Sequence, residues 1–295
     1  MQSIGPSPDR PSSWPGALWL VALCLSTLTA FPHGDVHLQI TELTQKIAAT
    51  PDNPELYIRR GELYRLHRLW DAALADFETA RTLPKAPETL DLSFGRLYVD
   101  AGWPETGRAV LTRFLKTHPD YGEAYVLRGR ALVQLDLPLN AAGDFSAAIK
   151  ASGMPRPELY IQRAQALTQA GPDHWVEALE GLDEGIEKLG PLVTLQLPAI
   201  EIELKRQSYD KALARLETVA AQSPRKESWL KRRGDILQLA DRQAEAIRAY
   251  KEALRAIESL PPARRNVPAI QELILEITQL LKDSDTTPEI STNTP

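Results

Sequence analysis

The sequence predicts an all-α protein, a solenoid of about six helix–turn–helix units with a capping helix at each end. Only 6% of the 295 residues are aromatic, so the core must consist of Leu, Ala, Ile and Val, and Ala and Leu favour helices. One position of a repeat recurs every 34 to 36 residues, and in most units it holds a small residue: Gly61, Gly95, Gly129, Ala164, Ile200 and Gly234. An alanine followed by an apolar residue recurs in the second half of most units, as at Ala73-Leu74 and Ala246-Ile247.

Residues 1–34 are predicted to be a targeting segment outside the repeat fold. The stretch Trp14–Phe31 carries no charge, follows Arg10 and ends before Pro32, which is typical of a secretory signal peptide. An uncleaved N-terminal anchor stays open, because the run approaches the roughly 18–20 residues that span a bilayer. Lipid attachment at Cys24 is a weaker alternative, since Leu23 departs from a lipoprotein box. We expect an exported protein, periplasmic or secreted, touching the membrane only through residues 14–31 if they are retained.

Two short amphipathic segments are predicted to cap the repeats. Residues 35–53 contain the first, Val36–Ala49, and residues 261–283 contain the second, Val267–Leu281. Solenoids need terminal helices that cover the open hydrophobic ends. The polar, Thr-rich segment 284–295 is predicted to be a disordered tail.

The body, residues 54–260, divides into six predicted units: 54–87, 88–121, 122–155, 156–192, 193–226 and 227–260. Each unit has two apolar stripes at helical spacing, and one helical hairpin buries both stripes only by stacking on the next. The fourth unit needs two extra residues near Pro172, and Pro198 in the first helix of the fifth predicts a kink or a late start there.

These residues resemble the tetratricopeptide repeat (TPR) family, whose 34-residue unit has Gly, Tyr, Ala, Phe and Ala at fixed places. The first unit supplies Gly61, Tyr64, Ala73, Phe77 and Ala80 at those places. The resemblance implies a right-handed α-solenoid with its first helices on the concave face. It also implies a protein that binds other proteins.

Composition and motifs argue against several function classes. The net charge of −5 disfavours a general nucleic-acid binder. The single cysteine and the scattered histidines predict no metal site, and neither a phosphate-binding loop nor a known catalytic motif occurs. We therefore expect no enzyme and no cofactor. An enzyme with an unrecognised site is the least favoured alternative.

In the resemblance, ligand peptides touch the second, fifth, ninth and twelfth places of the first helices. The candidate groove residues are Ile58, Glu62, Arg65, Leu92, Arg96, Val126, Arg130, Ile161 and Gln165. The hypothesis is a groove that binds a peptide or helix with acidic and apolar side chains, the arginines providing charge-assisted bonds and Ile58, Leu92, Val126 and Ile161 an apolar strip. In the alternative reading, these arginines pair with Glu62 and other neighbours.

The sequence thus predicts a non-catalytic interaction scaffold that holds one partner in its groove. An accessory subunit of a cell-envelope assembly, acting through its convex face or edges, is the alternative. A second set of arginines precedes the small residue of four units, at Arg60, Arg128, Arg163 and Arg233. We expect these side chains to cover the helix pairs with their aliphatic stems while exposing the charge.

Overall fold

The computed structural model describes residues 33–286, which form fifteen α-helices and no strand. The helices are α1 (His33–Ala49), α2 (Pro54–Leu66), α3 (Trp70–Thr82), α4 (Leu90–Asp100), α5 (Pro104–Thr117), α6 (Gly122–Gln134), α7 (Pro138–Ala151), α8 (Pro157–Ala170), α9 (Trp175–Leu189), α10 (Val193–Lys205), α11 (Tyr209–Gln222), α12 (Glu227–Leu239), α13 (Gln243–Glu258), α14 (Pro262–Arg265) and α15 (Pro268–Thr286). Residues 1–32 of the predicted signal segment and residues 287–295 lie outside the described residues, whereas residues 33 and 34 belong to α1.

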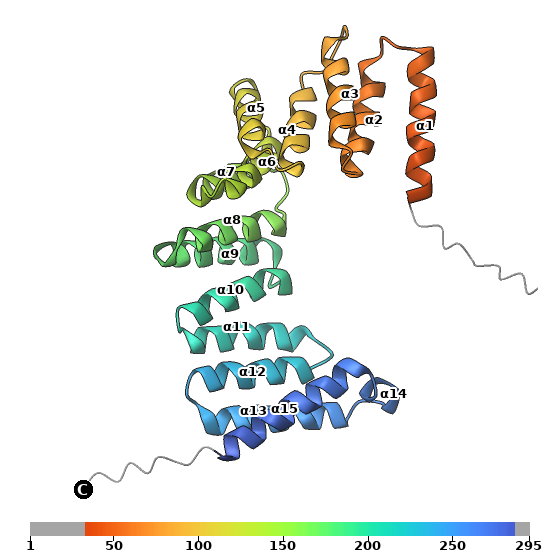
Figure 1. Ribbon diagram of the computed structural model, residues 1–295. Coiled ribbons are helices and arrows are strands. Elements are labelled where there is room, and N and C mark those ends of the chain that lie inside the picture. The colour runs from red at the N-terminus through yellow and green to blue at the C-terminus, as the bar shows by residue number, and fades with distance from the viewer. Residues whose placement is uncertain (1–32, 287–295) are drawn as a thin grey trace, which may run out of the picture.

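The helices stack in antiparallel pairs, and the six pairs from α2–α3 to α12–α13 follow one another along a curved solenoid (Figure 1). The predicted all-α solenoid is therefore confirmed. Helix α1 packs beside α2 at one end, and α15 packs against α13 at the other. The buried face of α1 is formed by Leu43 and Ile47, and that of α15 by Ile270 and Ile277.

Three segments show where the chain departs from the regular repeat or from the pattern predicted from the sequence. A single 3-10 turn, η1 (Pro172–His174), lies where the fourth unit has its two extra residues. Helix α10 begins at Val193 and contains Pro198, so the late start considered for this helix is not observed. Helix α15 continues to Thr286, so residues 284–286 are helical rather than part of the predicted tail.

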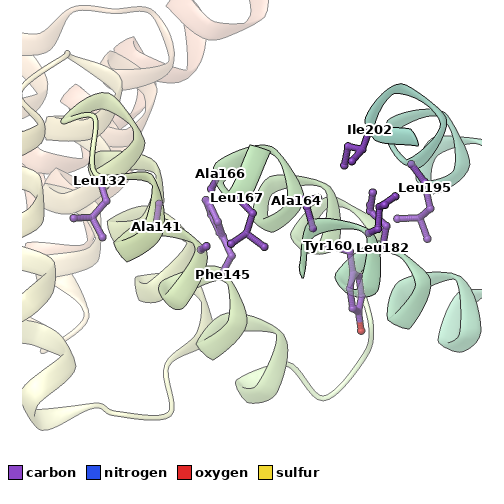
Figure 2. Close-up of a cluster of buried hydrophobic side chains, with 14 residues drawn as sticks. Leu132, Ala141, Phe145, Tyr160, Ala164, Ala166, Leu167, Leu182, Leu195 and Ile202 are labelled. Carbon is purple, nitrogen blue, oxygen red and sulfur yellow. The ribbon is translucent and has the colours of Figure 1, made fainter. Parts of the chain in front are cut away.

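The recurring small residues allow the two helices of a unit to approach each other closely. A Cβ placed on Gly61 would lie 2.5 Å from a ring carbon of Phe77, and one placed on Gly129 would lie 2.9 Å from Phe145. In the middle of the solenoid, Phe145, Tyr160 and Leu182 belong to one continuous core that runs from α6 to α10 (Figure 2). Stacking of the units therefore produces this core, because no single pair closes it.

Buried ion pairs join helices in the first and third units. The guanidinium of Arg60 on α2 donates two hydrogen bonds of 2.8 and 2.7 Å to Asp76 on α3, and a third of 2.9 Å to Thr44 on α1. Arg128 on α6 repeats this pattern 68 residues later with Asp144 and Thr112. We call each such three-helix arrangement a clamp. Because both carboxylates are almost fully buried, the expectation from the sequence that the arginines expose their charge is wrong for Arg60 and Arg128, whereas the Arg233 side chain is 51% exposed.

A third clamp, with its charges exchanged, joins the fourth and fifth units. Arg215 on α11 stands at the place that Asp76 and Asp144 occupy in their units. It donates hydrogen bonds of 2.7 and 2.8 Å to Asp183 on α9, and its Nε lies 3.8 Å from the buried carboxylate of Glu203 on α10. The hydrogen bond to Asp183 raises the pKa of Arg215, and burial opposes this effect. The clamp thus occurs with the arginine on the first helix of a unit, as in Arg60 and Arg128, or on the second helix, as in Arg215.

Candidate functional site

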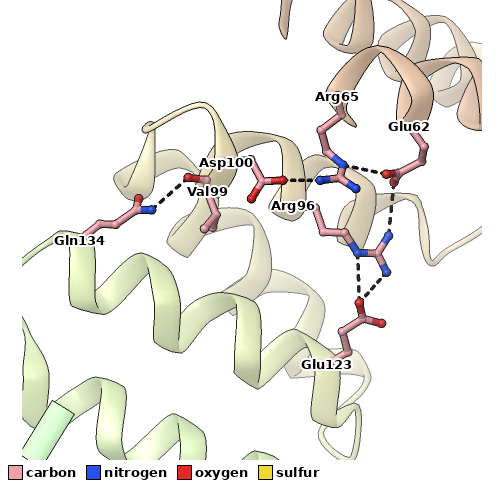
Figure 3. Close-up of polar contacts among 7 residues, drawn as sticks. All are labelled: Glu62, Arg65, Arg96, Val99, Asp100, Glu123 and Gln134. Carbon is pink, nitrogen blue, oxygen red and sulfur yellow. Dashed lines mark hydrogen bonds and ion pairs between the residues drawn. The ribbon is translucent and has the colours of Figure 1, made fainter. Parts of the chain in front are cut away.

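The first helices α2, α4, α6 and α8 present the candidate groove residues along one face of the solenoid. In the first half of this groove, Glu62 accepts hydrogen bonds from Arg65 at 2.7 Å and from Arg96 at 3.3 Å. Arg96 also donates to Glu123 at 2.7 and 3.0 Å, and Arg65 pairs with Asp100 (Figure 3). These residues form an ion-pair network that joins α2, α4 and α6.

The network determines what its two arginines can do. Burial by itself lowers the pKa of Arg96, but the hydrogen bonds and charges of Glu123 and Glu62 outweigh it, so that the pKa is raised. The side chain of Arg65 is only 14% exposed. Both guanidinium groups are therefore engaged within the protein. For Arg65 and Arg96 the geometry matches the alternative in which they pair with their neighbours.

The apolar strip predicted for the groove is interrupted. Leu92 is 2% exposed because it packs in a core with Leu111 and Leu115, and Val126 is 7% exposed because it packs with Leu159. Neither side chain is available to a ligand, so this part of the prediction is wrong. Ile58 and Ile161 are half-buried and retain some surface on the groove side.

The second half of the groove is open and differs in character. A cavity of about 460 Å³ lies between α4, α6 and α8, and its lining includes Arg130, Val133 and Gln165. Arg130 is exposed and makes no hydrogen bond or ion pair within residues 33–286. It is therefore the only one of the three predicted groove arginines whose charge is left unpaired by the described part of the chain.

Four glutamine side chains surround this cavity, and only Gln165 is among the groove residues predicted from the sequence. Gln134 donates to the Val99 carbonyl at 3.1 Å, and Gln169 donates to Asp136 at 3.1 Å. Gln162 is different, because its Oε1 is buried and has no hydrogen-bond partner in the described structure. The recurrence of glutamine at three- and four-residue steps, 162, 165 and 169, was the signal in the sequence.

An unpaired buried acceptor costs about 1–3 kcal/mol, which a donor from a bound molecule would recover. An amide can both donate to and accept from a peptide main chain, and an arginine can bind a carboxylate through two parallel hydrogen bonds. The cavity therefore has the groups to hold a peptide backbone and one acidic side chain. We call this region, lined by Arg130, Gln134, Gln162, Gln165 and Gln169, the amide site.

Other kinds of site find no support in the described residues. No group of three or more His, Cys, Asp or Glu side chains among residues 33–286 could hold a metal ion. Among the same residues, no helix is both long enough and apolar enough to cross a membrane.

Two segments of the chain match TPR family models. Residues 92–155 match a tetratricopeptide repeat model, and residues 177–270 match a tetratricopeptide repeat-like domain model. Together these segments make up more than half of the chain. No curated protein sequence matches it.

Several solved structures share the fold at low sequence identity. A fragment of a TPR protein from Cytophaga hutchinsonii is 16% identical, with a TM-score of 0.63 over 78% of this chain and 94% of that one. A TPR protein from Parabacteroides merdae is 18% identical, with a TM-score of 0.52 over 86% and 93%. The pilF protein of Pseudomonas aeruginosa is 13% identical, with a TM-score of 0.51 over 65% and 86%.

Proteins with this fold generally mediate protein–protein interactions and are typically not enzymes. The stacked helical pairs, the small residues between them and the two matched segments all identify the same kind of repeat. The chain belongs to the tetratricopeptide-repeat family.

Proposed function

We propose that this protein is a non-catalytic scaffold that binds a segment of a partner protein at the amide site. The observation that carries the proposal is the buried, unpartnered Oε1 of Gln162 beside the unpaired charge of Arg130, both lining one cavity. Packing of the solenoid requires neither group, whereas a bound peptide would use both. We propose an extended segment with at least one Asp or Glu.

The first half of the groove has a supporting role in this proposal. The network of Glu62, Arg65 and Arg96 holds α2 and α4 in a fixed relation, because hydrogen-bonded ion pairs that span helices resist sliding. A rigid groove reduces the entropy lost when a partner binds. Arg65 and Arg96 therefore position the groove, and Arg130 contacts the ligand.

Panning a random peptide library on the full chain tests the proposal. We expect the selected peptides to contain acidic residues and to bind wild type at least tenfold more tightly than the Arg130→Glu variant. Gln162→Leu should weaken binding severalfold, because the buried acceptor is lost. Lys150→Glu is the matched control, since Lys150 is also an exposed cation without a partner in the described chain but lies outside the groove, at the end of α7. Peptides that bind Arg130→Glu and Gln162→Leu as tightly as wild type would overturn the assignment.

We further propose that the repeat body works outside the cytoplasm, as residues 14–31 suggest. The proposal predicts that fractionation of the native cells finds the chain in the periplasmic, secreted or membrane fraction. N-terminal sequencing would then distinguish a cleaved signal from a retained anchor. Recovery of the full-length chain from the cytosol would contradict export.

A further inference from the structure

A second cavity, of about 510 Å³, lies away from the groove, where the second and third units meet. It is lined by helices α5, α6 and α7, and Figure 1 shows α5 and α7 on the outer side of the bend. Three cations of α5 line it, Arg108, Arg113 and Lys116, and all three side chains are exposed. We call this cavity the outer cationic pocket.

The pocket has a surplus of positive charge. Arg128 in the pocket is neutralised by Asp144 in the clamp described above. Arg113 has a partner in Asp91, at 3.1 Å. Arg108 and Lys116, in contrast, make no hydrogen bond or ion pair with any residue from 33 to 286. Two cations thus remain without a counter-charge at the rim of one cavity.

The pocket also contains hydrogen-bond donors that its own residues use little. The Nη1 of Arg128 reaches Thr112 only at 3.4 Å, a long hydrogen bond, whereas the equivalent Arg60–Thr44 contact is 2.9 Å. The exposed amide of Asn140 lies on the α7 side. An anionic group entering the pocket would therefore meet donors from α6 and α7 besides the cations of α5.

The first clamp shows that the three-helix frame does not need cations at its rim. The clamp of Arg60 and Asp76 has the same three-helix frame 68 residues earlier in the chain. At the places that correspond to Arg108, Arg113, Lys116 and Asn140, that region has Ile40, Gln45, Ala48 and Ala72. The frame therefore folds without cations at its rim, and packing does not explain their presence in the outer cationic pocket.

We propose that the outer cationic pocket docks an acidic segment of a partner protein, independently of the amide site. The segment places one carboxylate over Arg128 and Asn140, and others along the row of Arg108 and Lys116. This row extends for eight residues of α5, or about 12 Å at 1.5 Å per residue. It matches Asp or Glu side chains about two helical turns apart on a partner.

The shape of the pocket favours a protein segment over a membrane surface. The side chain of Arg128 is only 21% exposed, so a group must protrude to reach it. A side chain on a helix or loop protrudes in this way, whereas lipid headgroups present a broad plane.

A synthetic peptide provides the test. A fluorescein-labelled peptide with glutamate at every fourth position of an alanine host is titrated with the full chain at low salt, and fluorescence anisotropy is recorded. The same peptide with glutamine in place of glutamate is the control probe. Arg108→Glu combined with Lys116→Glu should weaken binding at least tenfold, and helicity and the urea midpoint should not change because both side chains are exposed.

Two controls decide the interpretation. Lys150→Glu should change the affinity less than twofold, and 0.5 M salt should weaken it strongly because screening is efficient for exposed charges. The proposal is overturned if the peptide does not bind, or if the double variant binds it normally. It is also overturned if Arg130→Glu abolishes binding, which would place the peptide in the groove, or if phosphatidylglycerol vesicles bind through Arg108 and Lys116 and the peptide does not.

Discussion

Removing Asp144 should destabilise the third unit far more than removing Asp91, a carboxylate that pairs with an exposed arginine. Asp144 is 7% exposed and accepts two hydrogen bonds of 2.7 Å from Arg128. Deleting one partner of a buried ion pair costs about 3–5 kcal/mol, because a charge is left without compensation. Since Arg128 keeps 21% of its side chain exposed, we expect the lower end, about 3 kcal/mol.

Asp91→Ala is the matched control for Asp144→Ala. Asp91 also pairs with an arginine of the same unit, but Arg113 is 63% exposed. Exposed ion pairs contribute about 0.2–1 kcal/mol, so this variant should be nearly neutral.

Urea denaturation of the full chain, followed by far-ultraviolet circular dichroism, measures both variants. With a slope of about 2 kcal/mol per molar urea, the midpoint should fall by about 1.5 M for Asp144→Ala and by less than 0.5 M for Asp91→Ala. Because repeat arrays can unfold region by region, hydrogen exchange of the α6 and α7 amides should be measured alongside the urea denaturation, to report the stability of the third unit itself. Equal midpoints for the two variants would refute the reasoning.

A double variant provides an internal check. Arg128→Met combined with Asp144→Leu removes both charges and replaces them by apolar side chains, which is often neutral or stabilising for a buried pair. The double variant should therefore be more stable than either single variant. Simple addition of the two single effects would show that the pair is not coupled.

Four further outcomes follow from the packing. Gly61→Ala should lower the free energy of unfolding by about 1–3 kcal/mol, because its Cβ would overlap the ring of Phe77. Gly143→Ala, where a Cβ meets nothing within 4 Å, should raise it by up to about 1 kcal/mol; both are read from urea midpoints, and equal effects would contradict the packing argument. Pro198→Ala should stabilise α10 by about 1 kcal/mol or more, since proline inside a helix lacks an N–H; a loss of stability would show that the proline is needed. Burial and the Asp235 carboxylate raise the pKa of Tyr250 above its ordinary 10.0, so the native state keeps a proton that the unfolded chain releases. Stability should thus fall as the pH rises above 10, and Tyr250→Phe should flatten this decline; an unchanged pH profile would refute the linkage.

The fold was predictable because the same packing of two helices recurs in successive units. A small residue opposite an aromatic, as at Gly61 and Phe77, records a close helix approach that must recur wherever the spacing recurs. Pro198 shows the limit of this reasoning, because α10 starts at Val193 in spite of it. Contacts with neighbouring helices overcame the local preference there.

The sequence predicts where the groove residues lie, but not which neighbouring side chains they pair with. The repeat register placed Arg65, Arg96 and Arg130 on one face, but which of them remains unpaired depends on contacts between units. Glu62 meets Arg96 because the two occupy the same place in consecutive units, 34 residues apart. That spacing is visible in the sequence, whereas the burial of Leu92 and Val126 depends on how far each pair is offset from the next.

The clamps also predict how the solenoid would respond to a pulling force applied at its ends. They tie α1 to α2 and α3, α5 to α6 and α7, and α9 to α10 and α11, which means that they bridge alternate junctions only. The junction between the first two units has no clamp but is bridged by the ion pairs of Glu62 and Arg65 with Arg96 and Asp100. Extension should therefore begin between the third and fourth or between the fifth and sixth units. The second and third units, which form the outer cationic pocket, should stay together while one end of the solenoid opens.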